Sequence, residues 1–348
     1  MQRYDAIIVG AGPAGSTLAR LLPGKWRILL IDGRGPGGKP CGGLLAPDAQ
    51  KALARFDLTL PKSVLVDPQI FSVKTIDVPS GLTRWYPRTY LNVNRNAFDG
   101  WLLSLLPGNV QVLSGRCVRV ERQEGGYCAH LREGEREWDA CAPMLVGADG
   151  ASSVVRRCLY PALRTRRYVA IQQWFAEGAA PVNPFYSCLF DPAATDCCSW
   201  SIHKDGTLIL GGAFPAPGCR AAFEAHKKRL ARFGFALEHP VRTEACTVLR
   251  PTGPGSFETG RQGAYLVGEA AGFISPSSLE GISSAILSAE ALSRSLDACD
   301  PARAYRRATR RLRAKLLLKN FKCPFMYAPA LRRLVMRSGL TALRVTPK

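Results

Sequence analysis

The chain has 348 residues, 47% of them hydrophobic, and carries a formal net charge of +20 at pH 7. This length and composition predict a globular protein of two domains, and every apolar run is interrupted before it reaches the roughly 18 residues of a membrane-spanning helix. The four histidines show neither metal-ligand spacing nor a Ser/His/Asp order, and the twelve cysteines form no CxxC pair. These patterns argue against a metal centre, a hydrolase and a disulfide framework. The first apolar run begins too close to the N-terminus for a signal peptide, so we expect a cytoplasmic protein.

The N-terminal segment has the pattern of a βαβ unit. Apolar residues at 4–9 and 27–31 predict two buried strands, and residues 13–22 predict the helix between them. The sequence GAGPAG joins the first strand to this helix, and an acidic residue ends the second strand, as in a dinucleotide-binding fold where FAD and NAD are alternatives. The glycines let the backbone approach a pyrophosphate at the helix N-terminus, and the acid accepts hydrogen bonds from the ribose. The cofactor-binding residues predicted here are Gly10, Gly12, Pro13, Ala14, Gly15 and Asp32.

Two kinds of segment alternate along the rest of the chain. Polar residues alternate with β-branched and aromatic ones at 69–91 and 169–214, as they do in antiparallel strands. A meander of strands is expected at 110–141, and buried strands at 144–148 and 264–267 continue the N-terminal fold. Helices are expected at residues 94–106 and 281–296.

These patterns predict an α/β protein in which one domain is inserted into another. The first is a Rossmann-type cofactor-binding domain, and the second is an antiparallel-sheet domain that holds the substrate. A basic helical tail completes the chain. The predicted ranges are 1–68, 92–168 and 255–300 for the first domain, 69–91 and 169–254 for the second, and 301–348 for the tail.

The tail contains 14 Lys or Arg residues, and no acidic residue follows Asp300. Two helices are expected, at 301–322 and 329–338, with a linker-like break at Cys323-Pro324. Such a tail can be a solvated helix face, a nucleic-acid patch or an anchor on an anionic membrane surface. We favour the membrane and expect no nucleic acid, because no aromatic stacking platform accompanies the charge. The interfacial pattern is formed by Arg306, Arg307, Arg310, Arg311, Arg313 and Lys315, which alternate with Leu312, Leu316 and Leu317.

Two later segments resemble the second and third flavin fingerprints of FAD-dependent hydroxylase-like proteins. They are GADGASSVVR, which begins at Gly147, and GEAAG, which begins at Gly268. Their order and spacing after GAGPAG fit that fold, so the resemblance implies FAD. Glu269 stands where the family has Asp, which adds one methylene to the expected ribityl contact. The cofactor contacts predicted on this basis are Asp149, Gly150 and Glu269, with Arg95 from the segment NVNR and with Val118.

The segment KPCGGL resembles the loop that lies beside the isoalloxazine ring in the geranylgeranyl reductase family. A later segment resembles the PxxxEGI element of the same family, and QIFSVKT, YVAIQQWFAE and APALRRLVMRSG are similar to its CbrA-type branch of bacterial flavoproteins. The resemblance to the geranylgeranyl reductase family as a whole covers nearly all of the chain to about residue 320. It implies further cofactor contacts at Lys39, Pro40, Cys41, Gly42, Gly43, Gly281 and Ile282.

The substrate end departs from the family pattern. The motif YxWxFP becomes CSWSIH, in which only Trp200 is retained, so we expect a different substrate pocket. The resemblance implies that Cys41 donates a proton and that Trp200 stabilises developing positive charge. His203 is a further candidate for the pocket.

The implied activity is FAD-dependent reduction of carbon–carbon double bonds in an isoprenoid or polyprenyl lipid. The reductant, NAD(P)H or another donor, would dock only transiently, because the sequence has no second GxGxxG motif that opens a helix. Two alternatives are a monooxygenase on the same fold and a non-catalytic flavin-binding resistance or interaction protein. A halogenase is disfavoured, because only Trp200 and Ile202 of its WxWxIP motif are present. If the tail binds lipid, the expected location is the inner membrane surface.

Overall fold

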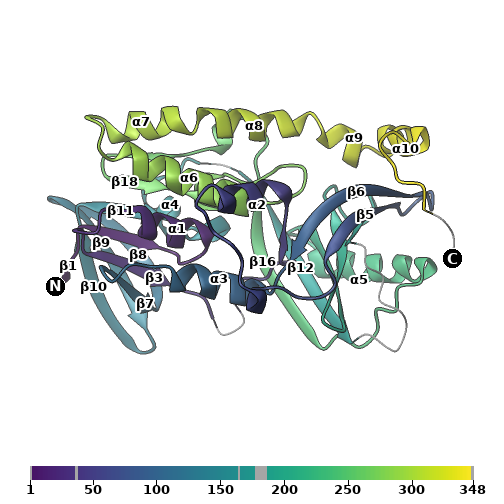
Figure 1. The fold of residues 1–348 in the computed structure, drawn as a ribbon, viewed down its shortest axis with the longest axis horizontal. Coiled ribbons are helices and arrows are strands. Elements are labelled where there is room, and N and C mark those ends of the chain that lie inside the picture. Colours follow the sequence, from purple (N-terminus) through teal and green to yellow (C-terminus); the bar gives the residue numbers. More distant parts are fainter. Residues whose placement is uncertain (1, 36–37, 164, 177–185, 346–348) are drawn as a thin grey trace.

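The computed structural model describes residues 2–35, 38–163, 165–176 and 186–345. Two lobes lie side by side along the long axis of the molecule, and a row of helices runs across the top of both (Figure 1). One lobe is built on a six-stranded and a four-stranded sheet, and the other on an eight-stranded sheet. This arrangement confirms the predicted α/β class with its additional, largely antiparallel sheet.

The six-stranded sheet forms the centre of the first lobe. Its order is β17-β18-β11-β2-β3-β7, and all neighbours are parallel except β17 and β18. The central strands consist of buried apolar residues such as Ile7 and Leu29, as expected for parallel strands covered on both faces. The strands are β2 (Ala6–Val9), β3 (Ile28–Asp32), β7 (Val110–Ser114), β11 (Met144–Gly147), β17 (Gly260–Arg261) and β18 (Ala264–Leu266).

A four-stranded sheet, in the order β1-β10-β9-β8, shares one hydrophobic core with the six-stranded sheet and its helices. The predicted meander is confined to β8, β9 and β10. Strand β7 instead pairs in parallel with β3, because the preceding helix α3 returns the chain in the direction of β3. The elements are β1 (Gln2–Arg3), β8 (Arg116–Gln123), β9 (Gly126–Glu133), β10 (Arg136–Ala142), α1 (Pro13–Leu21), α3 (Arg95–Ser104), α4 (Val154–Leu159), α6 (Ile282–Ser295), η2 (Gly150–Ser152), η4 (Pro254–Ser256) and η5 (Gly268–Ala271).

The eight-stranded sheet forms the second lobe in the order β16-β12-β15-β14-β13-β5-β6-β4. Its pairs are antiparallel, as predicted, except that β13 lies parallel to β5. Helix α5 packs on this sheet through Phe223 and Leu230. The elements are β4 (Leu44–Leu45), β5 (Ile70–Asp77), β6 (Thr83–Asn92), β12 (Arg166–Ala176), β13 (Tyr186–Phe190), β14 (Ser199–Lys204), β15 (Thr207–Pro215), β16 (Arg242–Arg250), α5 (Cys219–Leu230) and η3 (Ala231–Phe233). The elements α2 (Pro47–Ala54) and η1 (Lys62–Val64) pack on α6 and α3 of the first lobe.

The C-terminal tail forms the helices α7 (Pro301–Ala308), α8 (Arg310–Asn320), α9 (Cys323–Tyr327) and α10 (Pro329–Ser338), which span both lobes (Figure 1). The expected break at Cys323-Pro324 is wrong. A short helix begins there, because proline is tolerated in the first turn, where its missing N–H has no intrahelical partner.

The tail is tied to both lobes by buried contacts. The hydroxyl of Tyr305 donates to the carbonyl of Leu266 at 2.9 Å, and Arg332 Nε donates to Asp77 Oδ1 at 2.7 Å. Leu312 and Leu316, which the sequence assigned to a membrane face, pack on the core of the first lobe instead. Across the described residues, no helix is both long enough and apolar enough to cross a membrane.

Candidate active site

The glycine loop between β2 and α1 has little room on one side and open space on the other. Gly10 has φ +106°, and a Cβ on Gly15 would lie 1.8 Å from the Gly10 carbonyl oxygen. A Cβ on Gly12 would meet no atom within 4 Å. Helix α1 begins at this open side without a side-chain cap, so its first N–H groups are available to an anion. The loop therefore has the form that a pyrophosphate requires.

Asp32 lies at the carboxyl end of β3, where a ribose would be bound, and Arg34 holds both of its oxygens. The contacts are Arg34 Nε to Asp32 Oδ1 at 2.8 Å and Arg34 Nη2 to Asp32 Oδ2 at 2.7 Å. Burial acts to raise the pKa of Asp32, but the hydrogen bonds and charge of Arg34 outweigh it, so this pKa lies below its ordinary value. Asp32 is thus an ionised acceptor that Arg34 orients.

Residues from the KPCGG segment and from the second and third fingerprints meet beside the glycine loop, where a Cβ on Gly10 would lie 2.8 Å from Asp149 N. Lys39 Nζ lies 2.8 Å from Glu269 Oε2, and a Cβ on Gly150 would lie 3.7 Å from the same Nζ and 3.8 Å from the same Oε2. The charge of Glu269 raises the pKa of Lys39. Glu269 Oε1 also accepts the backbone N–H of Leu249 at 3.0 Å, which fixes the carboxylate. These two contacts accommodate the extra methylene of Glu269, relative to the Asp of the family, by holding its carboxylate in one position.

The second and third fingerprints are joined by an arginine that the sequence did not single out. Arg156 is buried and donates from Nη1 to the Ala270 carbonyl at 2.9 Å. Asp149 Oδ2 accepts the N–H of Val154, the first residue of helix α4, at 2.6 Å, and Ser153 is the N-cap of that helix. Burial raises the pKa of Asp149. Within the described residues, the Asp149 carboxylate therefore binds a backbone N–H group of its own fingerprint.

The KPCGG loop lies against strands β6 and β14. A Cβ on Gly42 would lie 2.6 Å from Ile202 Cδ1 and 3.7 Å from Trp200 Nε1, so the loop passes directly over the retained tryptophan. Gly43 has φ +63°, and its Cβ would lie 2.3 Å from the Val93 carbonyl oxygen. Only glycine suits these two positions without a shift of neighbouring atoms. The loop thereby brings the predicted catalytic residues Cys41 and Trp200 into one region.

The thiol of Cys41 lies beside two cationic groups. Its Sγ accepts the N–H of Gly43 at 3.4 Å. Burial acts to raise the pKa of Cys41, but the charge and hydrogen bond of Arg95 and the charge of Lys39 bring this pKa below its ordinary value. Arg95 is itself held by Asp99, with Nε 3.0 Å from Oδ1. Cys41 is therefore a stronger acid than an ordinary thiol, and its thiolate is stabilised.

Lys204 is a buried residue of this region that the sequence analysis missed. Its Nζ contacts Asn92 Oδ1 and donates to the carbonyls of Val93 at 2.7 Å and Gly43 at 3.3 Å. Burial lowers the pKa of Lys204 to about 8. The signal in the sequence is the alternation along β14, which places Lys204 on the same strand face as Trp200 and Ile202. The same alternation places His203 on the opposite face.

The remaining predicted cofactor contacts are Gly281, Ile282 and Val118. Gly281 precedes the first residue of α6, and Ile282 packs against a core cluster that contains Leu45 and Phe98. The neighbouring Glu280 accepts the hydroxyl of Tyr90 at 3.0 Å. Val118 lies on the four-stranded sheet, where it is 42% exposed. The described residues give Val118 no contact with the other predicted site residues.

A Ser–His–Asp arrangement is present that the sequence order did not reveal. Ser199 Oγ lies 2.8 Å from His226 Nε2, and His226 Nδ1 lies 2.8 Å from Asp191 Oδ2. All three side chains are buried, and Ser199 Oγ donates to the Leu189 carbonyl at 2.9 Å. A nucleophile needs access to substrate, which these buried groups lack. The arrangement fastens α5 to its sheet and does not support hydrolysis.

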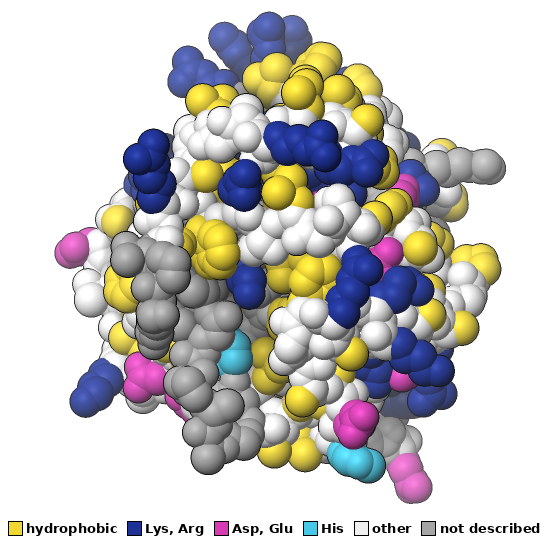
Figure 2. Space-filling model, turned by 90° about the vertical axis from the view of Figure 1, so that its right-hand side faces the viewer, with side chains coloured by type: hydrophobic (Ala, Val, Ile, Leu, Met, Phe, Trp, Pro, Cys, Tyr) yellow, Lys and Arg dark blue, Asp and Glu magenta, His cyan; other side chains and the backbone are white. Residues whose placement is uncertain are grey.

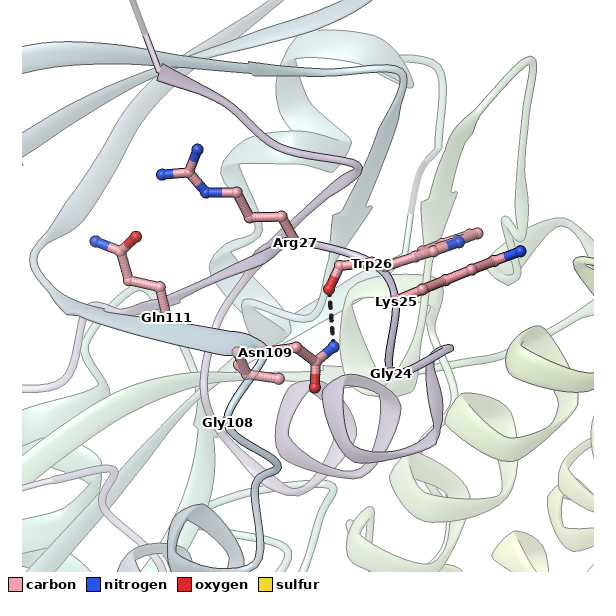
Figure 3. A pocket seen from close by; sticks show the side chains of 8 residues that line it. Gly24, Lys25, Trp26, Arg27, Gly108, Asn109 and Gln111 are labelled. Atoms are coloured by element: carbon pink, nitrogen blue, oxygen red, sulfur yellow. Dashed lines mark hydrogen bonds between the residues drawn. The ribbon is translucent and has the colours of Figure 1, made fainter.

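A surface pocket lies at the opposite edge of the six-stranded sheet from the glycine loop (Figure 3). It is lined by residues 24–27, which precede β3, and by residues 108–111, which include the first two residues of β7. Asn109 Nδ2 donates to the Trp26 carbonyl at 2.8 Å. Ligands of open α/β sheets bind at the carboxyl ends of the strands. This pocket is at the amino ends and is separate from the candidate site.

Sequence relatives identify the group of proteins to which the chain belongs. Protein CbrA of Escherichia coli O6:H1 is 51% identical over 98% of this chain and 94% of its own length. Protein CbrA of Shigella sonnei is 50% identical over 98% of each chain. The chain belongs to the CbrA family. This result confirms the CbrA-type resemblance, although no model of a known protein family matches the chain.

Solved structures show the fold of this CbrA-family chain. A geranylgeranyl bacteriochlorophyll reductase-like protein from Thermoplasma acidophilum aligns with a TM-score of 0.72 and 20% identity, covering 99% of this chain and 89% of that chain. A probable FAD-dependent monooxygenase, PqsL from Pseudomonas aeruginosa, aligns at 0.70 and 18%, covering 97% and 100%. The flavin-dependent brominase Bmp2 aligns at 0.68 and 21%, covering 97% and 93%. The fold is that of the FAD-dependent hydroxylase-like flavoproteins, as the three fingerprints predicted.

Proposed function

We propose that this CbrA-family protein binds FAD and is an FAD-dependent oxidoreductase. The observation that carries the proposal is the meeting of Lys39 from the KPCGG segment with Gly150 and Glu269 from the second and third fingerprints, beside an open glycine loop. The space at Gly12 suits a pyrophosphate, and the ionised Asp32 suits a ribose. The fold shared with FAD-dependent proteins supports the same cofactor.

The reaction we propose is reduction of a carbon–carbon double bond in an isoprenoid or polyprenyl lipid. FAD, when bound and reduced, supplies a hydride, and the protein must supply a proton to the other carbon. In this proposal Cys41 donates that proton from Sγ, and the support is that Arg95 stabilises the thiolate that remains. Trp200, beside the same loop, would stabilise positive charge on the carbon skeleton. Transiently bound NAD(P)H or another reductant would return the cofactor to its reduced state.

Lys204 is a positioning residue in this scheme. Its ammonium holds the carbonyl of Gly43, two residues from Cys41, together with Asn92 and Val93. These contacts hold the loop that carries the thiol and that lies against Trp200 at Gly42. A loop that was free to move would lose the alignment that proton transfer requires.

The cofactor proposal is tested by heating the purified protein and identifying what it releases. We expect FAD in a 1:1 ratio to protein; release of FMN or NAD, or of no cofactor, would refute the proposal. The proton-donor role is tested with Cys41→Ser, which should retain FAD and its reduction by dithionite but form product about tenfold more slowly. Unchanged product formation in Cys41→Ser and Cys41→Ala would reduce Cys41 to a packing role.

A monooxygenase is the second candidate. Its support is that PqsL shares the fold as completely as the reductase-like protein, with 97% of this chain covered at a TM-score of 0.70. Substrate-stimulated NAD(P)H consumption in air, with isotopic oxygen entering the product, would favour it over the reductase. A flavin that no donor reduces would instead favour a non-catalytic flavin-binding protein.

A further inference from the structure

The outward face of α7, α8 and α9 carries a line of exposed side chains. The chain passes from α8 into α9 through Phe321 and Lys322, whose N–H groups still bond to the carbonyls of Leu318 and Lys319. Exposed residues recur along this path at intervals of four and three, as expected for one face of a helix. We call this set the outer stripe; it comprises Arg307, Arg311, Ala314, Leu318, Phe321 and Phe325.

The outer stripe changes from basic to apolar along its length. Leu318 is 63% exposed, Phe321 is 74% exposed and Phe325 is 54% exposed. The inward face of α8 is already covered, because Leu316 is buried in the core of the first lobe. These three apolar side chains are therefore not required for the packing of the helix. Large apolar side chains grouped on a surface mark a contact with a partner or a membrane.

Helix α10, at the end of the tail, also has exposed apolar side chains beside basic ones. Its inward side chains, Arg332 and Met336, are buried, whereas Leu334 is 67% exposed. Leu340 follows and is 70% exposed. Seen from that end, hydrophobic side chains lie among Lys and Arg side chains along the top of the molecule (Figure 2).

The charge around this surface selects an anionic partner. Arg306, Arg310 and Lys322 are exposed beside the outer stripe, and Arg337 is exposed on α10. The chain has no acidic residue after Asp300. Apolar side chains within a basic border match the interface of an anionic lipid bilayer, where apolar groups enter the acyl boundary and cations remain at the headgroups.

We propose that the outer stripe and the exposed face of α10 form a docking surface for an anionic phospholipid bilayer. A convex helical surface favours a bilayer over single-stranded nucleic acid, which is bound in a groove between a basic track and stacking aromatics. The tail is fixed to the second lobe, since Arg84 Nε donates to the Met336 carbonyl at 2.9 Å and Leu343 pairs with Trp85. Docking would therefore orient the whole molecule on the membrane. The proposal does not depend on the cofactor or on the substrate.

The test is co-sedimentation of the full-length protein with vesicles of phosphatidylglycerol and phosphatidylethanolamine, compared with phosphatidylcholine vesicles. We expect binding to the anionic vesicles only, weaker at high salt. The triple variant Leu318→Gln/Phe321→Gln/Phe325→Gln and the variant Arg307→Glu/Arg310→Glu/Arg311→Glu should each lose at least about tenfold in affinity. The matched control Val112→Gln/Val241→Gln, which changes exposed apolar residues elsewhere, should bind as the unaltered protein does.

Three outcomes would overturn the proposal. The first is failure of the unaltered protein to bind anionic vesicles at low salt. The second is equal loss of binding in the control variant. The third is a dimer in solution that the triple glutamine variant dissociates, which would make the surface an interface between two copies of this chain. Unfolding curves of each variant provide the check on folding, and normal vesicle binding by a protein without reductase activity would leave the docking surface intact.

Discussion

The glycine loop and the C-terminal tail are both conspicuous in the sequence, but their structures follow from different causes. The form of the loop is set within a few residues, because a Cβ on Gly15 would collide with Gly10 at 1.8 Å. The form of the tail is set by distant partners, because the buried Arg332 pairs with Asp77, 255 positions earlier in the chain. A short motif can therefore be interpreted locally, whereas an amphipathic helix cannot be oriented until its packing is known.

The largest expected effect lies in the glycine loop. Gly15→Val should abolish FAD binding, because its side chain would occupy the space of the Gly10 carbonyl. Gly12→Ala should keep the fold, since its Cβ meets no protein atom within 4 Å, but should bind FAD weakly because the methyl group faces the pyrophosphate. Released FAD and urea unfolding measure the two effects. Gly24→Ala, also in open space, is the control, and stoichiometric FAD in Gly15→Val would contradict the local account.

The tail gives the next largest effect. Arg332→Met leaves the buried carboxylate of Asp77 without its cation, which should lower the free energy of unfolding by about 3–5 kcal/mol. Arg337→Met removes an exposed arginine from the same helix and should change it by less than about 0.5 kcal/mol. Urea unfolding at pH 7 measures both. If both variants lost a similarly small free energy of unfolding, the tail would not contribute to the stability of the fold.

Lys204 joins strand β14 to the end of β6 and to the KPCGG loop, and it gives a smaller, pH-dependent effect. Lys204→Met should destabilise the protein at pH 7 by about 1–3 kcal/mol, because three acceptors lose their donor. Burial lowers the pKa of Lys204 from 10.5 to about 8, so the unfolded state binds the proton more tightly. The stability of the unaltered protein relative to Lys204→Met should therefore rise between pH 8 and 10.5. A difference that stays constant over this range would contradict the lowered pKa.

The mildest test concerns the thiol of Cys41. Arg95 holds the pKa of Cys41 below its ordinary value, so alkylation by iodoacetamide should begin at a lower pH than for an ordinary thiol. Arg95→Gln should move the Cys41 profile to higher pH. Peptide mapping follows Cys41 separately, and the exposed Cys299 serves as the internal control. Identical Cys41 profiles in the two proteins would remove Arg95 from this role.

The same contrast explains what the sequence could predict. The first strand, helix and second strand were predicted to within two residues, because buried-strand patterns and a proline at the helix start are local signals. The meander was wrong at β7, where the choice between pairing with β3 and with β8 depends on the path of α3. The break at Cys323-Pro324 was wrong because proline both ends helices and begins them.

In the candidate site, too, local motifs could be predicted from the sequence, whereas contacts between distant residues could not. The convergence of the three fingerprints followed from their order in a known fold. Lys204 could not be placed from the sequence, because its partners Gly43 and Asn92 are more than 100 positions away and a lysine in a strand is ordinarily exposed. The Ser199–His226–Asp191 contact was missed for the same reason, since it joins two strands and a helix of the second lobe.

The central claim is that this chain holds FAD beside Cys41 and Trp200 and uses it to reduce a lipid double bond. The most direct measurement is a single turnover without oxygen, in which the dithionite-reduced protein, freed of excess dithionite, is mixed with a polyprenyl phosphate and the lipid is analysed by mass spectrometry. The account predicts that the flavin is reoxidised as the lipid gains two hydrogens, and that Cys41→Ser slows both changes together. A flavin that remains reduced until air is admitted, with the lipid then unchanged or oxygenated, would contradict it.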